Sequence, residues 1–155
     1  GKTWTNWALN EISIEKSDSG MANLLVSIDG EPLSQWACDG ILCATPTGST
    51  AYAFSAGGPI VWPEVEALLV VPVSAHALFN RPIVVSPTSK IEVAVNSAPV
   101  TISADSRRSF EVGQGAVVKV VRHQDPVKFA RVQPTPFTAR LVAKFELPIQ
   151  GWRNK

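Results

Sequence analysis

Thr45-Pro-Thr-Gly-Ser-Thr-Ala-Tyr-Ala-Phe-Ser-Ala-Gly-Gly58 is the stretch that decides how the chain is interpreted. The apolar run Ile41–Ala44 precedes it and is typical of a buried strand. Four hydroxyl residues then follow within six positions, interrupted by Pro46 and Gly48. Proline removes a backbone donor and glycine permits conformations that other residues avoid, so neither favours a continuing strand. We therefore expect the strand to end in a tight turn.

A short helix is expected after this turn, over Ser49–Ala56, because the residues are small with two aromatic exceptions. Gly57-Gly58-Pro59 is a typical stop signal. Serine and threonine at a helix start cap backbone N–H groups, and the same position can bind an anion. The composition alone fits equally well with a capped short helix in a β protein.

Most of the remaining chain consists of short runs that fit strands, separated by turn residues such as Asp29-Gly30. The expected strands are Trp4–Lys16, Leu24–Ile28, Glu31–Ala37, Ala67–Val73, Pro82–Val85, Lys90–Val95, Val100–Ala104, Phe110–Val112, Ala116–Arg122 and Val127–Val132. The apolar residues Phe137, Leu141 and Phe145 recur at helical spacing before Pro148, and Trp152 is expected to anchor the tail. The pattern predicts a mainly β fold: a multi-stranded β-sandwich with one short helix after the Thr-Pro-Thr-Gly-Ser-Thr turn and a C-terminal helix.

Composition places the chain among well-buried domains, because 45% of its 155 residues are hydrophobic and only 17% are charged. A face covered by a partner is a further interpretation of the low charge. A net charge of +1 does not indicate binding to nucleic acid or to an anionic membrane. Cys38 and Cys43 are expected on opposite faces of one strand, without a disulfide or zinc site, in a reducing compartment. The chain begins at Gly1 without methionine, so we expect a fragment of a longer protein.

The string Thr-Pro-Thr-Gly-Ser-Thr-Ala-Tyr, preceded by Asp39-Gly40 and followed by Gly-Gly-Pro, resembles the nucleotide-binding signature of bacterial NAD kinases. The resemblance implies an enzyme that phosphorylates the 2′-hydroxyl of the adenosine ribose of NAD to make NADP. It also implies ATP or polyphosphate as donor, together with a divalent metal ion, Mg²⁺. The family's catalytic aspartate lies in a Gly-Gly-Asp-Gly run of an N-terminal α/β domain. Residues 1–155 are therefore expected to form the NAD-binding C-terminal domain, with no catalytic residue and no metal ligand of its own.

The resemblance assigns roles to Asn10, Glu11 and Asp39. From the pattern alone, Asn10 and Glu11 fit an exposed edge strand, whereas the family pair at this place contacts the riboses and amide of the dinucleotide. The vicinal hydroxyls of a ribose offer donors and acceptors that suit such side chains. Asp39 is either a turn residue or the family's contact to the nicotinamide side of NAD.

Thr50, Ala51, Tyr52 and Ser55 match positions that line the adenosine pocket in the family. Thr45, Thr47 and Ser49 are expected to cap the turn instead of touching ligand. His76 matches another family segment and is more simply a structural loop residue. Asp105 lies in an Asp-Ser-Arg run where the family often has Asp-Gly-Gln, so a solvated hairpin is expected there.

The partners that the resemblance implies are NAD, ATP or polyphosphate, the chain's own N-terminal domain, and further copies in a dimer or tetramer in the cytoplasm. Two alternatives remain open at this point. One is a lipid kinase of the diacylglycerol or sphingosine kinase type, which shares a β-sandwich second domain. The other is a non-catalytic β-sandwich module that binds a nucleotide.

Overall fold

The computed structural model describes residues 3–97, 99–130 and 132–150 of the chain. It divides into two compact units, Gly1–Asp125 and Pro126–Lys155, which are described separately. Within the described residues, the first unit contains the strands β1–β10 with the short helical segments η1 and α1, and the second contains α2.

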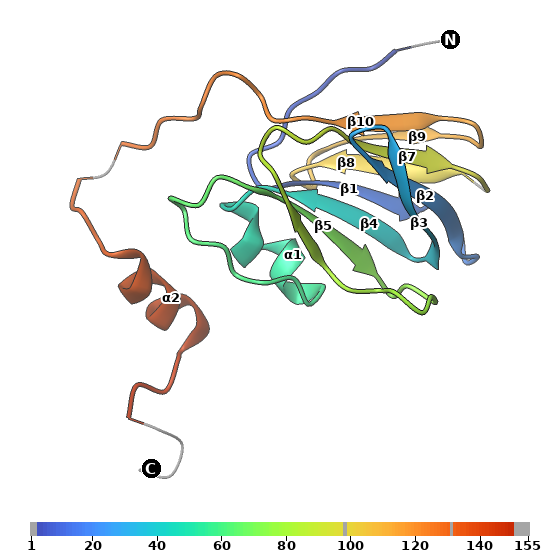
Figure 1. The fold of residues 1–155 in the computed structure, drawn as a ribbon. Helices are drawn as coiled ribbons and strands as arrows, with labels where there is room; N and C mark the ends of the chain where they lie inside the picture. Colours follow the sequence, from blue (N-terminus) through green and yellow to red (C-terminus); the bar gives the residue numbers. More distant parts are fainter. Residues whose placement is uncertain (1–2, 98, 131, 151–155) are drawn as a thin grey trace. The chain divides into compact units, whose positions relative to one another are not determined.

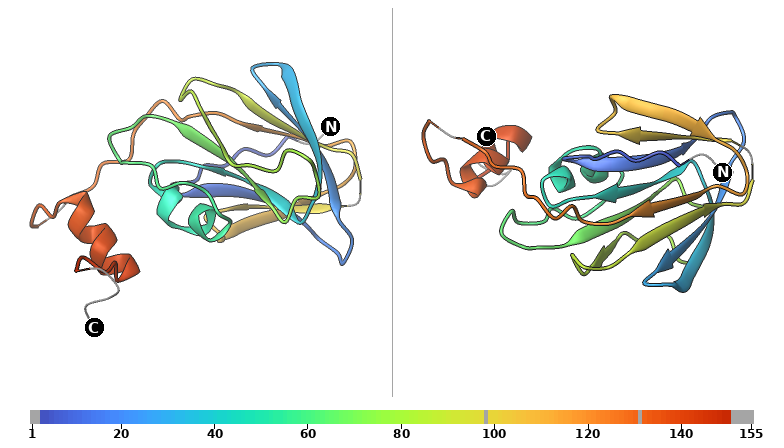
Figure 2. Two further views of the ribbon diagram at one scale, coloured as in Figure 1. Left: turned by 60° about the horizontal axis from the view of Figure 1, so that its bottom comes forward. Right: turned by 90° about the horizontal axis from the view of Figure 1, so that it is seen from above.

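Six strands form one antiparallel sheet in the order β6-β5-β4-β1-β8-β9. They are β1 (Glu11–Lys16), β4 (Gly40–Ala44), β5 (Leu68–Val73), β6 (Ile83–Val85), β8 (Val100–Ala104) and β9 (Arg108–Val112). A second antiparallel sheet has the order β10-β7-β2-β3, from β2 (Ala22–Ile28), β3 (Glu31–Cys38), β7 (Ile91–Val95) and β10 (Val117–Val120). Figures 1 and 2 show the two sheets stacked on each other, and this confirms the predicted β-sandwich.

The main core fills the space between the two sheets. Ile14 of β1 and Ile102 of β8 contribute from the six-stranded sheet, and Leu24 and Trp36 contribute from the four-stranded sheet. Trp36 is fully buried, and its indole N–H donates a 2.8 Å hydrogen bond to the carbonyl of Phe79. Each strand gives every second side chain to this core, so the face of β1 that does not point inward is free to carry polar residues.

A second, smaller apolar cluster lies on the opposite face of the six-stranded sheet. Leu42 of β4 and Leu69 of β5 pack there with Ala53, which belongs to the one-turn helix α1 (Tyr52–Ser55). The 3-10 turn η1 (Gly48–Thr50) leads into α1. The predicted helix is therefore present, but it begins at Tyr52 and not at Ser49.

The two cysteines differ from the prediction that one strand carries them on opposite faces. Cys38 ends β3 and Cys43 lies in β4, because the chain crosses from one sheet to the other at Asp39. Both thiols consequently point into the same core, and both are free. Burial raises the pKa of Cys38 to about 11 and that of Cys43 to about 12, so both remain protonated and unreactive.

The predicted hairpin at Asp29-Gly30 is confirmed, since both residues have the positive φ that a tight hairpin turn requires. The predicted strand over Val127–Val132 is wrong for the residues that the structure describes. Residues 126–130 and 132 have irregular backbone, and Val127 and Phe129 are more than half exposed. Alternating apolar residues form a strand only where a neighbouring strand pairs with their backbone.

The second unit contains the predicted C-terminal helix, α2 (Phe137–Phe145). It begins after Pro136 and ends before Pro148, at Glu146, whose φ of 50° is left-handed. Trp152 lies outside the described residues. Among the helices of the described ranges, none is long and apolar enough to cross a membrane.

Candidate functional site

Strand β1 presents three polar side chains on the face of the six-stranded sheet that α1 partly covers. Glu11, Ser13 and Glu15 alternate with the core residues Ile12 and Ile14. Glu11 is only 5% exposed and Ser13 only 4%. Two carboxylates and a hydroxyl on a largely buried strand face require partners, because burying such groups without hydrogen bonds is unfavourable.

Tyr52 supplies partners for both carboxylates. Its phenol O–H donates a 2.6 Å hydrogen bond to Oε1 of Glu15, and its backbone N–H lies near enough to the Glu11 carboxylate to act against the rise in the pKa of Glu11. Ser13, which lies between them on the strand, donates to Oε2 of Glu15 at 2.9 Å. Tyr52 therefore lies beside β1, with its backbone near Glu11 and its phenol bonded to Glu15.

Glu11 retains one buried carboxylate oxygen, Oε2, without a hydrogen-bond partner in the described structure. Burial raises the pKa of Glu11, and the nearby Asp105 carboxylate raises it further, while the backbone N–H of Tyr52 acts in the opposite direction. A buried acceptor that the protein leaves open is a feature of sites that receive a donor from a ligand.

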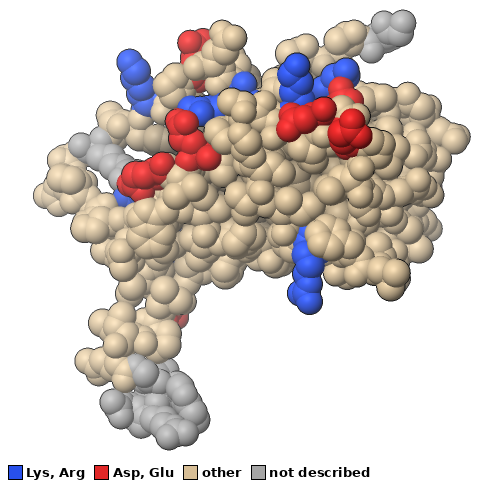
Figure 3. Space-filling view, viewed as in Figure 1, with Lys and Arg blue, Asp and Glu red and all other residues tan. Residues whose placement is uncertain are grey.

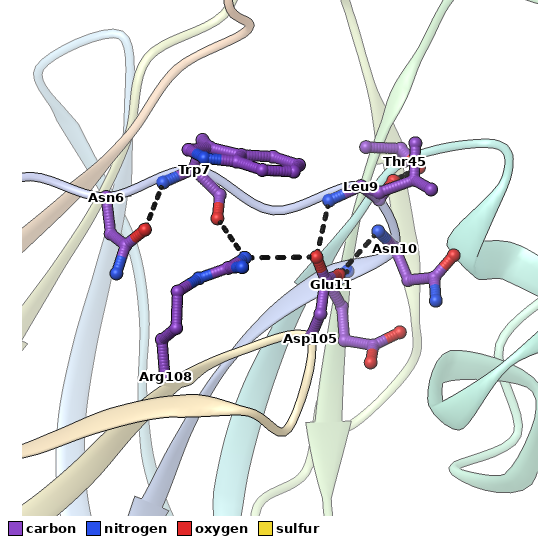
Figure 4. A network of polar contacts seen from close by, with 8 residues as sticks. All are labelled: Asn6, Trp7, Leu9, Asn10, Glu11, Thr45, Asp105 and Arg108. Atoms are coloured by element: carbon purple, nitrogen blue, oxygen red, sulfur yellow. Dashed lines mark hydrogen bonds and ion pairs between the residues drawn. The ribbon is translucent and has the colours of Figure 1, made fainter. Parts of the chain in front are cut away.

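Asp105 fixes the backbone at the start of β1. Its carboxylate accepts hydrogen bonds from the backbone N–H groups of Leu9, Asn10 and Glu11, at 2.8, 2.7 and 3.3 Å (Figure 4). Burial alone would raise the pKa of Asp105, but these N–H donors and the Arg108 guanidinium outweigh it and lower the pKa. This differs from the expectation of a solvated hairpin, because the turn after β8 lies against the residues before β1.

Arg108 completes this arrangement. Its guanidinium lies 3.3 Å from Oδ2 of Asp105, donates to the Trp7 carbonyl at 2.8 Å, and lies over the Trp7 ring, 4.6 Å from its centroid. In Figure 4 the side chains of Asn10 and Glu11 extend away from the Asp105 carboxylate. Asn10 and Glu11 are thus held in place through their backbone N–H groups, and both side chains are left for other contacts.

The hydroxyl-rich turn is joined to the same backbone through Gly48. A Cβ on Gly48 would lie 2.0 Å from the Asn10 carbonyl oxygen, so only glycine permits this approach. The backbone N–H of Thr45 donates to that same oxygen at 2.9 Å. Thr45 Oγ1 donates to the Leu9 carbonyl and accepts the N–H of Gly48, which confirms the expected capping role.

Ser49 also hydrogen-bonds backbone groups of the turn instead of facing outward, as expected. It is fully buried, donates to the Pro46 carbonyl at 2.6 Å and accepts the N–H of Val61 at 2.9 Å. The turn is therefore locked from inside by Thr45 and Ser49. Thr47 differs from the expectation, because it is exposed and its side chain makes no capping hydrogen bond.

Asp39 lies between β3 and β4, close to the end of β1. Its carboxylate is 2.7 Å from the Lys16 ammonium group. Hydrogen bonds from Lys16 first, and then from Ser74, lower the pKa of Asp39. Its charge also contributes to raising the pKa of the Tyr52 phenol. His76 is exposed and pairs its backbone with Ala37, which fits the structural role expected for it.

Thr50, Ala51 and Ser55 occupy η1, the junction to α1, and the end of α1. Ala51 has an irregular backbone conformation that turns the chain between the two helical segments. These three residues therefore flank Tyr52 along the chain, whereas Glu11 and Asp39 act on its phenol through their charges. The sequence analysis missed Glu15, although its spacing of four from Glu11 places both on one strand face.

The described residues do not fit a metal ion. Within these ranges, no group of three or more His, Cys, Asp or Glu side chains converges as metal ligands. A surface depression formed by Pro87, Lys90, Arg122 and His123 contains none of the predicted site residues.

Comparison with known proteins gives a consistent result. Residues 9–132 match the family described as the ATP-NAD kinase C-terminal domain. The chain is 58% identical to an NAD kinase of Thermobifida fusca over 152 residues, which are 96% of this chain and 47% of the relative. It is 55% identical to an NAD kinase of Rhodococcus opacus, again covering 96% of this chain and 48% of the relative. The chain thus spans about half the length of the curated relatives it matches.

Two solved structures share the fold. One is yeast NADH kinase complexed with NADH, with a TM-score of 0.71 and 37% identity, covering 74% of this chain and 34% of that one. The other is an NAD kinase from Archaeoglobus fulgidus in complex with ATP, with a TM-score of 0.69 and 34% identity, covering 76% of this chain and 46% of that one. With a family match that covers most of the sequence and relatives at this level of identity, the chain belongs to the ATP-NAD kinase C-terminal domain family.

Proposed function

We propose that this chain is the dinucleotide-binding half of an NAD kinase. The complete enzyme transfers a phosphoryl group from ATP or polyphosphate to the 2′-hydroxyl of the adenosine ribose of NAD, and NADP is the product. The observation that carries the proposal is the buried, unpartnered Oε2 of Glu11, which lies beside Tyr52 within the family-matched segment.

The chemistry of this side chain suits a ribose. A ribose hydroxyl is a donor and an acceptor, and the open oxygen of Glu11 is an acceptor that needs a donor. The Asn10 amide, adjacent in sequence, offers both donors and an acceptor. Asn10 and Glu11 are therefore proposed to orient the ribose, with Asp39, Thr50, Ala51, Tyr52 and Ser55 forming the remainder of the dinucleotide site.

Phosphoryl transfer depends mainly on positioning and on electrostatic stabilisation of the transferred group. A rigid sheet that fixes the ribose supplies the positioning. The catalytic aspartate is proposed to lie in an N-terminal domain outside this chain. The divalent metal ion, Mg²⁺, would neutralise charge on the donor phosphates when bound, and the residues that the structure describes offer no group of three or more ligands for it.

A partner surface is proposed for the same unit, formed with the N-terminal domain and with further copies in a dimer or tetramer in the cytoplasm. Large apolar side chains are exposed, among them Trp4, Trp7, Leu33 and Phe79. In Figure 3, charged side chains gather along one border of the sandwich and most of its remaining visible surface is uncharged. Exposed apolar surface of this kind is typical of protein–protein contacts, whereas nucleic acid or an anionic membrane would require a basic face.

The test is steady-state kinetics of the complete enzyme with NAD, ATP and Mg²⁺, with NADP as the measured product. Glu11→Gln preserves the shape of the side chain but removes its charge, so we expect kcat/KM for NAD to fall about a hundredfold. Glu31→Gln, an exposed carboxylate at the start of β3, is the matched control and should behave as wild type.

Near-wild-type activity of Glu11→Gln would contradict the site assignment. A separate assay tests whether the catalytic aspartate lies outside this chain. The isolated chain should bind NAD but should not form NADP. NADP formation by the isolated chain would show that the essential acid lies within it.

A further inference from the structure

Glu15 lies outside the family signature, yet it holds the Tyr52 phenol. The phenol O–H donates to Oε1 of Glu15 at 2.6 Å, and the Ser13 O–H donates to Oε2 at 2.9 Å. In both contacts the hydroxyl is the donor and a carboxylate oxygen of Glu15 is the acceptor. A phenol has only one proton, and in this structure that proton belongs to the bond with Glu15.

The groups around the Tyr52 phenol oxygen also favour the protonated phenol that donates to Glu15. The hydrogen bond to Glu15 is the main cause that raises the pKa of Tyr52 to about 12, followed by burial and by the charges of Glu15, Asp39 and Glu11. The phenol therefore stays protonated at physiological pH. Its remaining capacity toward a ligand is two lone pairs, and the neighbouring carboxylates are acceptors as well.

We propose that Glu15 determines the specificity of the nucleotide site by fixing Tyr52 as a hydrogen-bond acceptor, so that its ligand partner must be an amino group. This inference rests on the proposed function. An amino group brings two N–H donors, which match the phenol oxygen together with a neighbouring carboxylate. A hydroxyl has a single proton, so one that donates to the phenol oxygen has none left for the neighbouring carboxylate, and a phosphate is both an acceptor and an anion.

NAD carries two amino groups of this class, one on adenine and one on the nicotinamide carboxamide. Two analogues replace them by acceptors: in one, hypoxanthine replaces adenine, and in the other, nicotinic acid replaces nicotinamide. The proposal requires that one of these analogues loses its contact with Tyr52. The dinucleotide's phosphates must lie away from the phenol.

The experiment measures binding of NAD and of both analogues to the complete enzyme by calorimetry, and turnover of each. Wild type should discriminate against one analogue by about tenfold or more, since an N–H donor replaced by an acceptor leaves two acceptors facing each other. Glu15→Ala frees the phenol to rotate and donate, so this discrimination should largely disappear. Tyr52→Phe should abolish it too, and the double variant should match Tyr52→Phe.

Glu111→Ala is the matched control, because Glu111 of β9 faces the same side of the sheet across Thr101 of β8. It should keep the wild-type discrimination. The NMR signal of the Tyr52 Cζ, assigned by its loss in Tyr52→Phe, gives a readout that needs no activity: in Glu15→Ala the phenol should ionise at lower pH than in wild type.

The outcomes separate the two proposals. Absence of NAD binding and of NADP formation in wild type overturns the proposed function, and the inference falls with it. If wild type phosphorylates NAD but Glu15→Ala keeps the analogue discrimination, only the role of Glu15 is overturned. If wild type binds and turns over NAD and both analogues equally well, the role of Glu15 is likewise overturned. An unchanged phenol titration in Glu15→Ala contradicts the hydrogen bond itself.

Discussion

The two faces of the six-stranded sheet use the same strands for different purposes. The inner face contributes Ile14, Ile41 and Ile102 to a large apolar core closed by the second sheet. The outer face is divided: Leu42 and Leu69 pack under α1, whereas β1 exposes carboxylates to Tyr52. The inner face is filled mainly by apolar side chains, although Arg108 Nε of β9 is buried there without a hydrogen-bond partner. The outer face contains the unpartnered carboxylate oxygen of Glu11. We therefore expect the inner face to contribute mainly to stability and the outer face to carry the proposed dinucleotide site.

The sharpest way to test this separation is Gly48→Ala, which acts only on the outer face. The added Cβ would lie 2.0 Å from the Asn10 carbonyl oxygen, so the turn and the Asn10 backbone must move apart. Displacement of this order at a positioning residue lowers kcat/KM about a hundredfold. The measurement is steady-state kinetics of the complete enzyme, beside a thermal melt.

Gly113→Ala is the control for this prediction, because a Cβ there meets nothing within 4 Å. It should leave both kinetics and melting unchanged. If Gly48→Ala kept wild-type kcat/KM, the close approach of the turn to Asn10 would have no role in binding.

Adjacent residues of β4 offer a matched pair for the second prediction. Ile41 and Leu42 are both fully buried, but Ile41 faces the inner core and Leu42 faces the cluster under α1. Truncation of either to alanine should lower the free energy of unfolding by about 3 kcal/mol. Only Leu42→Ala should also raise KM for NAD, because it loosens the packing beneath Tyr52.

Urea unfolding measures the first quantity and initial rates below the melting range measure the second. Equal changes in KM for Ile41→Ala and Leu42→Ala would erase the functional distinction between the faces.

The smallest expected effect concerns Asp105, which holds the residues just before β1. Its pKa is lowered in the folded state, so the ionised carboxylate stabilises the fold above its ordinary pKa, and this contribution is lost as pH falls through the lowered value. Asp105→Asn should destabilise the protein at neutral pH by about 1–2 kcal/mol, because charge-assisted hydrogen bonds from backbone N–H groups are weakened. Its stability should then fall less steeply than that of wild type below pH about 4.

Chemical unfolding at a series of pH values gives this comparison directly. Parallel pH profiles for wild type and Asp105→Asn would mean that the carboxylate is not ionised in contact with those N–H groups.

The sequence predicted the sandwich because its strands and turns depend on local patterns, whereas the proposed roles of Asn10 and Glu11 came from the family resemblance and not from the strand pattern. Alternation in β1 and the Asp29-Gly30 turn are readable within a few residues. The roles of Asp105 and Arg108 were not readable, since their partners Leu9, Asn10 and Trp7 lie about a hundred residues away in sequence. The wrong strand over Val127–Val132 has the same origin, because pairing with a neighbour is a tertiary property.

The alternation of polar and apolar residues in β1 limits which sequence changes this strand can accept during evolution. Inserting or deleting a single residue within Ile12–Ile14 would turn every following side chain to the other side of the sheet. An isoleucine would then meet the phenol, and Glu15 would enter the hydrocarbon interior. Single substitutions in β1 can be tolerated, but a one-residue shift of its strand register would abolish folding and ligand recognition together.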